Sequence, residues 1–301
     1  MSSHEKQPQL SAPPTSDPYP RSTLNPLPND TLFTTLCPSY ETAFANNPAQ
    51  DNSIVWLLSQ LSSADTFPPP GRPWIHDSLP PHLQRKRILD IGSGTGRPVC
   101  SSLAEAGHSV LGIDNCPAMV DFARQNVASL YPDGRAEFLE ADLRTFNPEE
   151  DDPFFQARAE ALKAKGEVWG EEDPQGWYHA VTAHFSLIAG MNSQKEIKEV
   201  FRSVYGWLRE GGLFVFGTAP MDVDGEVIEW MGKPVLCSSL TRSQVLEAMR
   251  GVGFEVEWEV TTRFKPKAVE AGIVKKKEEA EKVAEEEHLF VYAVKMWYPE
   301  E

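Results

Sequence analysis

The residues best suited to ligand chemistry lie together in one short segment, Asp90-Ile91-Gly92-Ser93-Gly94-Thr95-Gly96. It follows an apolar run, residues 87–91, that is typical of a buried strand, and precedes a helix expected from about Pro98 to Ala106. A glycine-rich turn between a strand and a helix lets a ligand approach backbone N–H groups at the helix N-terminus. The sequence therefore predicts a small-molecule site whose turn contacts come from Gly92, Ser93, Gly94 and Gly96.

Three features of the sequence narrow the ligand. The glycine spacing is GxGxG, and Arg97 occupies the position where a dinucleotide fingerprint places its third glycine. Asp90 precedes the turn, where a carboxylate suits an ammonium group and not a pyrophosphate. Asp114 ends the next expected strand, about twenty residues after the first glycine, where an acid accepts hydrogen bonds from ribose hydroxyls. A cationic nucleoside without phosphate satisfies all three, and S-adenosylmethionine is such a ligand.

The elements around this turn alternate between strands and helices, which is typical of a parallel sheet covered on both faces. We expect further strands at 109–114, 136–143, 179–188 and 213–219. Helices are expected at 117–130 and through the apolar positions from Ile197 to Leu208, with Gly211-Gly212 ending the second helix.

The remaining segments are expected to surround this core. Residues 221–301 carry a hairpin ("GEVIEW" and "KPVLCSS"), a helix capped by Thr241, and a strand pair at 255–264 and 288–297. A charged segment, 275–287, predicts a helix exposed to solvent. Near the N-terminus, a proline-rich tail (1–30) precedes two short amphipathic helices. An acidic insertion at 147–176 is expected to hold a helix over 154–165.

Composition excludes several classes of function. The chain has 301 residues, with 44 acidic against 28 basic side chains and a formal charge of −16. Such a surface repels phosphate backbones and anionic lipids, so we expect neither nucleic acid nor membrane as a partner. The four cysteines are widely separated and no metal-ligand spacing is present, so we expect reduced thiols, no metal and a cytoplasmic location.

The segments "ILDIGSGTGR", "VLGIDNCPAMVDFAR", "EFLEADL" and "LREGGLFVFGT" together resemble the class I S-adenosylmethionine-dependent methyltransferase family, of the small-molecule type. The resemblance is strong over roughly 85–220 and extends in general layout to 297. It implies an α/β fold with a Rossmann-like, seven-stranded, mostly parallel sheet whose last strand is antiparallel. It also implies one methyltransferase domain over 31–301, divided into a helical cap (31–85), a cofactor-binding core (86–220), and a flap with the C-terminal strands (221–301).

The same resemblance implies a set of contacts to the cofactor S-adenosylmethionine. Asp90 and the glycine turn would hold its methionine part, and Asp114 its ribose. Asn115 and Met119 would lie beside the adenine ring, and Asp142, with the backbone N–H of Leu143, would bind the adenine amino group and ring. Pairing with Arg144 is the alternative for Asp142, and packing alone is the alternative for Met119.

The sequence signals for substrate-binding and catalytic residues are weaker than those for cofactor contacts. His184, near the end of the fourth expected strand, is a candidate catalytic base near neutral pH, and a structural histidine is the alternative. Tyr40 and Phe44 are candidates for a lid over the substrate, as are Glu229 and Trp230 in the expected flap. For all of these, packing without chemistry remains the alternative.

These observations predict an enzyme that methylates a small molecule on oxygen, nitrogen, sulfur or carbon by in-line transfer. The segment after the fourth expected strand reads "AHFSLIAG" and lacks the DPPY-like motif common in nucleic-acid methyltransferases. Two other interpretations remain open: an enzyme that binds S-adenosylmethionine but catalyses a non-methylating rearrangement, and a methyltransferase-like regulatory or interaction protein. The sequence indicates neither the acceptor atom nor the oligomeric state.

Overall fold

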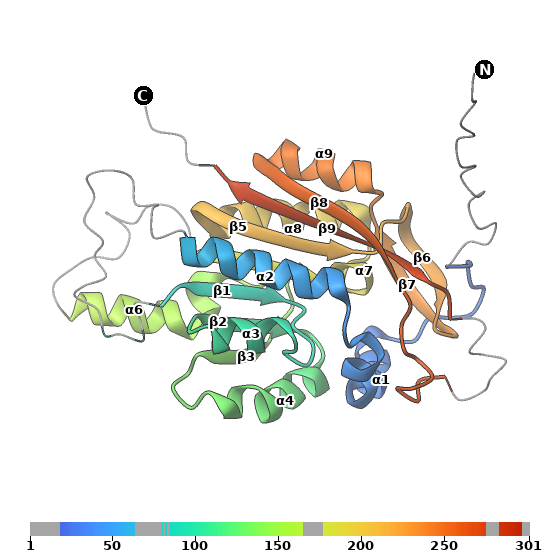
Figure 1. The fold of residues 1–301 in the computed structure, drawn as a ribbon, viewed down its shortest axis with the longest axis horizontal. Coiled ribbons are helices and arrows are strands. Elements are labelled where there is room, and N and C mark those ends of the chain that lie inside the picture. Colours follow the sequence, from blue (N-terminus) through green and yellow to red (C-terminus); the bar gives the residue numbers. More distant parts are fainter. Residues whose placement is uncertain are drawn as a thin grey trace, which may run out of the picture.

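A seven-stranded sheet forms the centre of the molecule (Figure 1). The structure, a computed structural model, describes residues 19–63, 80, 82, 85–164, 177–274 and 283–296. The strand order is β3-β2-β1-β4-β5-β9-β8, and only β9 runs antiparallel to its neighbours. The expected fold, with an antiparallel last strand, is therefore confirmed. The strands are β1 (Arg87–Ile91), β2 (Ser109–Asp114), β3 (Ala136–Glu140), β4 (Tyr178–His184), β5 (Leu208–Thr218), β8 (Phe254–Phe264) and β9 (Glu286–Lys295).

Helices cover both faces of the sheet, because the central strands carry apolar side chains on both sides. Ile88 of β1 packs into one buried cluster and the adjacent Leu89 into the other. The Ile88 face is covered by α2 (Pro48–Ser63), α3 (Val99–Glu105) and α4 (Pro117–Asn126). The Leu89 face is covered by α6 (Pro153–Lys163), α8 (Gln194–Trp207) and α9 (Arg242–Val252).

Several expected boundaries around the central strands were wrong. β3 ends at Glu140 and not at 143, and β5 begins at Leu208 and not at 213. The fourth strand ends at His184, not at 188, because Phe185 adopts a left-handed conformation with φ of 58° and the chain turns into α7 (Ser186–Gly190). The apolar residues Leu187 and Ile188, which were expected in the strand, belong to this short helix. Helix α8 ends at Trp207, before the Gly211-Gly212 pair, because Leu208 already pairs with Tyr178 as part of β5.

The N-terminal region also differs from the expectation. Residues 1–18 lie outside the described part, but the last third of the expected tail is ordered against the hairpin of β6 (Val223–Trp230) and β7 (Lys233–Ser239). Ser22 donates its backbone N–H to Val227 O at 2.9 Å, and Tyr19 is only 5% exposed. The prediction of an unpacked tail up to residue 30 is therefore wrong. The buried ring of Tyr19 and the backbone hydrogen bond of Ser22 hold this segment against the hairpin.

The expected helical cap separates into two parts. Helix α1 (Asn29–Phe44) lies with the hairpin at the end of the sheet where the parallel strands finish (Figure 1). Helix α2 instead packs on the face of the sheet, where Leu57 and Leu61 are buried. Helix α1 therefore lies over that end of the sheet, and the first turn of α2 reaches it through Gln50 and Asp51.

The two charged insertions are described in part. The acidic one holds α5 (Pro148–Asp151) and α6, close to the helix expected at 154–165, and its residues 165–176 lie outside the described part. Of the expected helix at 275–287, residues 275–282 also lie outside. Residues 283–285 are not helical, and Glu286 begins β9, so the helical expectation is wrong there.

In the described residues no helix has the length and apolar character that a bilayer crossing requires.

Candidate active site

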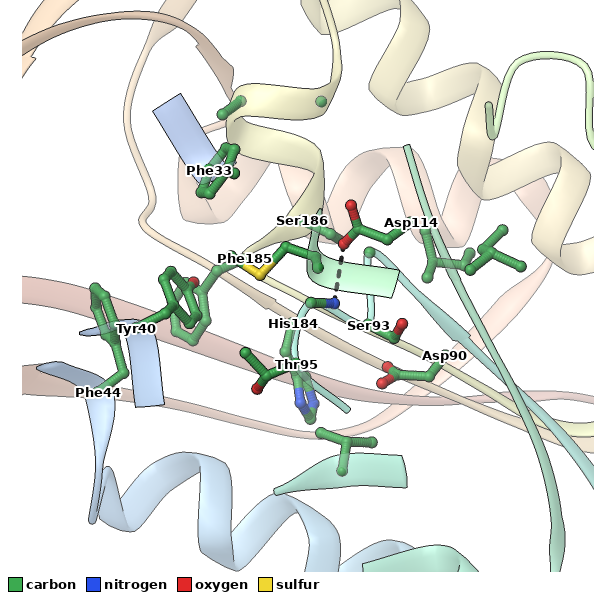
Figure 2. Close-up of a pocket in the computed structure, with 18 of the residues that line it drawn as sticks. Phe33, Tyr40, Phe44, Asp90, Ser93, Thr95, Asp114, His184, Phe185 and Ser186 are labelled. Atoms are coloured by element: carbon green, nitrogen blue, oxygen red, sulfur yellow. Dashed lines mark hydrogen bonds between the residues drawn. The ribbon is translucent and has the colours of Figure 1, made fainter. Parts of the chain in front are cut away.

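A cavity of about 370 Å³ opens where β1, β2 and β4 end (Figure 2). β1 lies between β2 and β4 in the sheet, and the chain leaves these strands toward opposite faces. Crevices at such a switch point are the usual ligand sites of open α/β sheets. Helix α1 supplies a further wall of the cavity through Asn29, Phe33, Tyr40, Glu41 and Phe44.

The glycine turn after β1 forms the floor of this cavity. Gly94 has a φ of 53°, and a Cβ built on it would meet no heavy atom within 4 Å, so its backbone faces open space. Gly96 does not line the cavity: a Cβ there would lie 2.6 Å from Cζ of Phe138, so close packing requires glycine. Gly92, Ser93 and Gly94 are therefore the predicted turn residues that reach the cavity, and Gly96 is not.

Asp114 joins the end of β2 to the turn. Its Oδ2 accepts from Gly94 N at 2.9 Å, drawn as a dashed line in Figure 2, and its Oδ1 accepts from Cys116 N at 2.8 Å. Burial raises the pKa of this carboxyl, while these backbone donors lower it. Each oxygen keeps a lone pair for a ligand hydroxyl.

Asp90 lines the cavity and also holds its surroundings together. The carboxylate, 3% exposed, accepts from Thr182 Oγ1 at 2.6 Å and from Cys100 Sγ at 3.2 Å, so it links β1 to β4 and α3. Burial raises its pKa to about 6. It combines a structural role with a position from which it can accept a hydrogen bond from a ligand.

The residues expected around an adenine ring line one side of the cavity: Asn115, Met119, Asp142 and Leu143. Met119 is 2% exposed and also packs against Cys37 of α1, so it contributes to the core as well. Asp142 lies beyond the end of β3, and Arg144 Nε donates to it at 2.9 Å. This pairing holds the pKa of the Asp142 carboxyl below its usual range. The alternative considered for Asp142, pairing with Arg144, is thus present.

His184 faces the cavity from the last position of β4 (Figure 2). Its Nε2 lies 3.3 Å from Ser53 Oγ, its ring meets Phe290 edge-on, and its Nδ1 has no hydrogen-bond partner among the described residues. Burial lowers the pKa of the ring to about 3. The imidazole is therefore neutral near pH 7, and the role of His184 as a catalytic base stays a prediction.

The four candidate lid residues divide into two pairs. Tyr40 and Phe44 line the cavity and their ring centroids lie 4.9 Å apart. Trp230 does not line it, but stacks on Phe44 at 6.0 Å and lines a smaller cavity behind. Glu229 lines neither of these two cavities; its backbone N–H donates to Pro20 O at 2.8 Å and holds the N-terminal segment. The structure thus does not bring Glu229 to the site.

Several polar atoms at the cavity are buried and lack a hydrogen-bond partner among the described residues. Buried polar groups without partners are rare in folded proteins, and a bound ligand or water satisfies them. Thr95 belongs to the glycine turn, so its place in the motif could have indicated it. Ser93 of the same turn and His184 were predicted, whereas Asn29, Glu41 and Ser186 lie in other segments and no sequence pattern marks them. These atoms are Asn29 Oδ1, Glu41 Oε1, Ser93 Oγ, Thr95 Oγ1, His184 Nδ1 and Ser186 Oγ.

Among the residues described, no group of histidine, cysteine and acidic side chains could hold a metal ion.

Known proteins show what the chain is similar to. A family model described as "Methyltransferase domain" matches residues 71–259. YqeM of Bacillus subtilis (strain 168), named as a candidate methyltransferase, is 30% identical over 143 residues, 48% of this chain and 45% of that protein. The biotin biosynthesis bifunctional protein BioHC of Cellvibrio japonicus (strain Ueda107) is 51% identical over 49 residues, 16% of this chain and 10% of that protein. The chain therefore matches less than half the length of each of these curated relatives.

Two solved structures have a similar fold. A SAM-dependent methyltransferase from Methanosarcina mazei is 15% identical with a TM-score of 0.50, covering 75% of this chain and 99% of that one. The magnesium protoporphyrin IX methyltransferase of Synechocystis PCC 6803, solved with bound SAM, is 13% identical with a TM-score of 0.52, covering 91% and 100%. These likenesses concern the fold alone. Because the family model spans more than half of its residues, the chain belongs to the methyltransferase domain family.

Proposed function

We propose that this protein transfers a methyl group from S-adenosylmethionine to a small molecule. The observation that carries the proposal is the cluster of buried, unpartnered polar atoms lining a 370 Å³ cavity beside the glycine turn. Its volume lies within the range of small-molecule sites, about 300–1,000 Å³. Family membership supplies the class of reaction.

The residues at the turn suit this cofactor. Asp114 has free lone pairs at the end of β2 for the ribose hydroxyls, and Asp90 presents a buried carboxylate for the ammonium group. The open space above Gly94 allows close backbone approach. Asn115, Met119, Asp142 and Leu143 provide a partly apolar wall for the adenine ring.

When bound, S-adenosylmethionine supplies a methyl group activated by a positively charged sulfur. The chain's own contribution is to align the acceptor and to exclude water from it. Tyr40 and Phe44 close the side of the cavity nearest α1. Neutral His184 can accept a hydrogen bond at Nδ1 from an acceptor O–H or N–H and so orient it, but with a pKa of about 3 it is a weak base.

A small molecule suits the site better than a polymer. Residues of α1 form one wall of the cavity, which limits the room for a polymer. The formal charge of −16 also disfavours binding of nucleic acid. The cytoplasmic location expected from the sequence is part of this proposal.

The experiment that tests the proposal has two steps. Isothermal titration with S-adenosylhomocysteine should give about one bound molecule per chain. Absence of binding would contradict the proposal that S-adenosylmethionine is the cofactor. Incubation with methyl-labelled S-adenosylmethionine and a small-molecule cell extract, followed by mass spectrometry, should show label in a product. Cofactor binding with products that carry no label would favour the rearrangement interpretation instead.

A further inference from the structure

A second cavity, of about 60 Å³, lies next to the first one behind α1. Phe33, Tyr40, Phe44, Phe185 and Ala189 line both cavities, so the two are separated only by side chains of α1 and of the turn into α7. The far wall comes from the β6–β7 hairpin, the N-terminal segment and β9. The two cavities therefore share a wall, and a substrate that occupies both must displace side chains of that wall.

Aromatic rings form much of this second cavity. Trp230 stacks on Phe44 with an interplanar angle of 20°, and Phe44 in turn lies 4.9 Å from Tyr40, centroid to centroid. Tyr19 and Phe185 add two further rings. Aromatic faces attract cations through the negative potential over the ring, most strongly where water is excluded.

One carboxylate, Glu286, lies in this aromatic wall and is 7% exposed. Its Oε1 accepts from Trp230 Nε1 at 2.9 Å and its Oε2 from His288 Nε2 at 3.1 Å. Asn47 Nδ2 lies 3.0 Å from His288 Nδ1 and donates to it, which leaves the ring proton on Nε2 facing Glu286. The carboxylate is thus fixed in position and retains lone pairs for another donor.

The other titratable groups of the second cavity stay neutral. Burial raises the pKa of the Cys237 thiol to about 12, and burial together with nearby Glu286 raises the pKa of the Tyr19 hydroxyl. In the first cavity, Glu41 and Asp51 are further acids not engaged by the expected cofactor contacts. Arg97 and His184 are the basic side chains among the described residues that line the first cavity, and none of those lining the second cavity is basic. The nearby His288 already uses its Nε2–H to donate to Glu286. A carboxylate or phosphate on the substrate would therefore find no basic side chain in the lining of the second cavity, whereas a cation would find the carboxylate of Glu286.

We propose that the second cavity anchors the substrate, and that the substrate is an apolar or aromatic molecule with a protonated amine that binds Glu286 among the rings. The inference rests on the proposed function and deepens it. A protonated amine has no lone pair, so this group is an anchor, and the atom that receives the methyl group lies elsewhere on the molecule, toward the first cavity.

Three probes of similar shape and different charge test the proposal: phenethylamine, 2-phenylethanol and 3-phenylpropionate. Each is titrated calorimetrically into the full chain saturated with S-adenosylhomocysteine. Phenethylamine should bind at least about tenfold more tightly than the alcohol, and the carboxylate most weakly. Glu286→Gln should reduce phenethylamine to the level of the alcohol. Glu287→Gln, its exposed neighbour on β9, should retain the wild-type preference.

The outcomes separate the two proposals. If S-adenosylhomocysteine binds but the wild-type protein shows no preference for the amine, the anchor proposal is overturned and the cofactor proposal stands. If S-adenosylhomocysteine does not bind, the cofactor proposal fails, and titration of the three probes alone still decides whether an amine is preferred. An unaltered preference in Glu286→Gln would also overturn the anchor. The wild-type ranking needs no variant, so it remains decisive even if Glu286→Gln fails to fold.

Discussion

Asp114 accepts hydrogen bonds from two backbone N–H groups that hold its carboxylate in place. The bond from Gly94 N joins the end of β2 to the turn after β1, and the bond from Cys116 N orients the carboxylate within its own loop. A ribose would therefore meet a carboxylate that is already oriented, and little ordering would remain to oppose binding.

Replacing Asp114 by alanine should weaken binding of S-adenosylhomocysteine by about 1–3 kcal/mol, because charge-assisted hydrogen bonds to the ribose are lost. Isothermal titration measures the change. Asp121→Ala, on the exposed side of α4, should bind like the wild type. Unchanged affinity in Asp114→Ala would remove this residue from the ribose site.

His184 should make stability depend on pH. Its pKa is about 3 in the folded protein and about 6.5 in the unfolded chain, so between these values the unfolded chain binds more protons. The free energy of unfolding should therefore fall as the pH drops from about 6.5 toward 3, and His184→Gln should reduce that fall. Urea unfolding at pH 7.5 and pH 5 gives the comparison; an identical fall in both proteins would contradict the buried neutral ring.

At the scale of residues, the sequence predicted the local turn motif and the more distant Tyr40 and His184, but it missed Glu286. The turn and Asp114 could be placed because strand, turn and acid lie within about twenty-five residues. Glu286 and Tyr40 are far apart in the chain, and nothing in the sequence shows that they share a wall of the second cavity. The pKa of His184 also depends on neighbours such as Phe290 that only the fold supplies.

Among the elements, α9 has the clearest local signals at both ends. Thr241 accepts from Gln244 N, and the Gln244 side chain accepts from Thr241 N in return, which completes a capping box. Gly253, at a φ of 114°, ends the helix. Each signal involves residues that are close together in the sequence, and the helix was predicted correctly. The end of β4 was not, because the left-handed turn at Phe185 occurs at a residue type that rarely adopts it.

Thr241→Ala should lower the free energy of unfolding by about 1 kcal/mol, because the first turn of α9 loses its side-chain acceptor. Thr241→Ser keeps that acceptor and should stay close to the wild type. Denaturant titration of the three proteins provides the measurement. Equal stability of all three would show that the box contributes nothing.

For the molecule as a whole, a buried ion pair fastens the acidic insertion to the sheet. Arg87 and Asp152 are both fully buried, with Arg87 Nε donating to Asp152 Oδ2 at 3.0 Å and Tyr178 Oη donating to the same oxygen at 2.9 Å. Arg87 is the first residue of β1 and Tyr178 the first residue of β4. The ion pair therefore lies at the opposite end of the sheet from the cavity.

Asp152→Ala should destabilise the protein by about 3–5 kcal/mol, because it leaves the buried Arg87 guanidinium without its main counter-charge. Affinity for S-adenosylhomocysteine should not change in the fraction that remains folded. Thermal unfolding and isothermal titration test the two statements. Glu199→Gln, which disturbs an exposed pair with Lys195, is the control and should alter neither quantity appreciably.

The position of β9 has a consequence for how the chain folds as it is synthesised. β9 comes last along the described part of the chain, yet it lies between β5 and β8 in the interior of the sheet. A nascent chain that has not yet produced Glu286 has no partner for β8 and leaves the edge of β5 open. It also lacks the carboxylate of the second cavity. Synthesis proceeds at about 5–20 residues per second, so the earlier strands leave the ribosome seconds before β9 can close the sheet. The substrate site is complete only after β9 has joined the sheet.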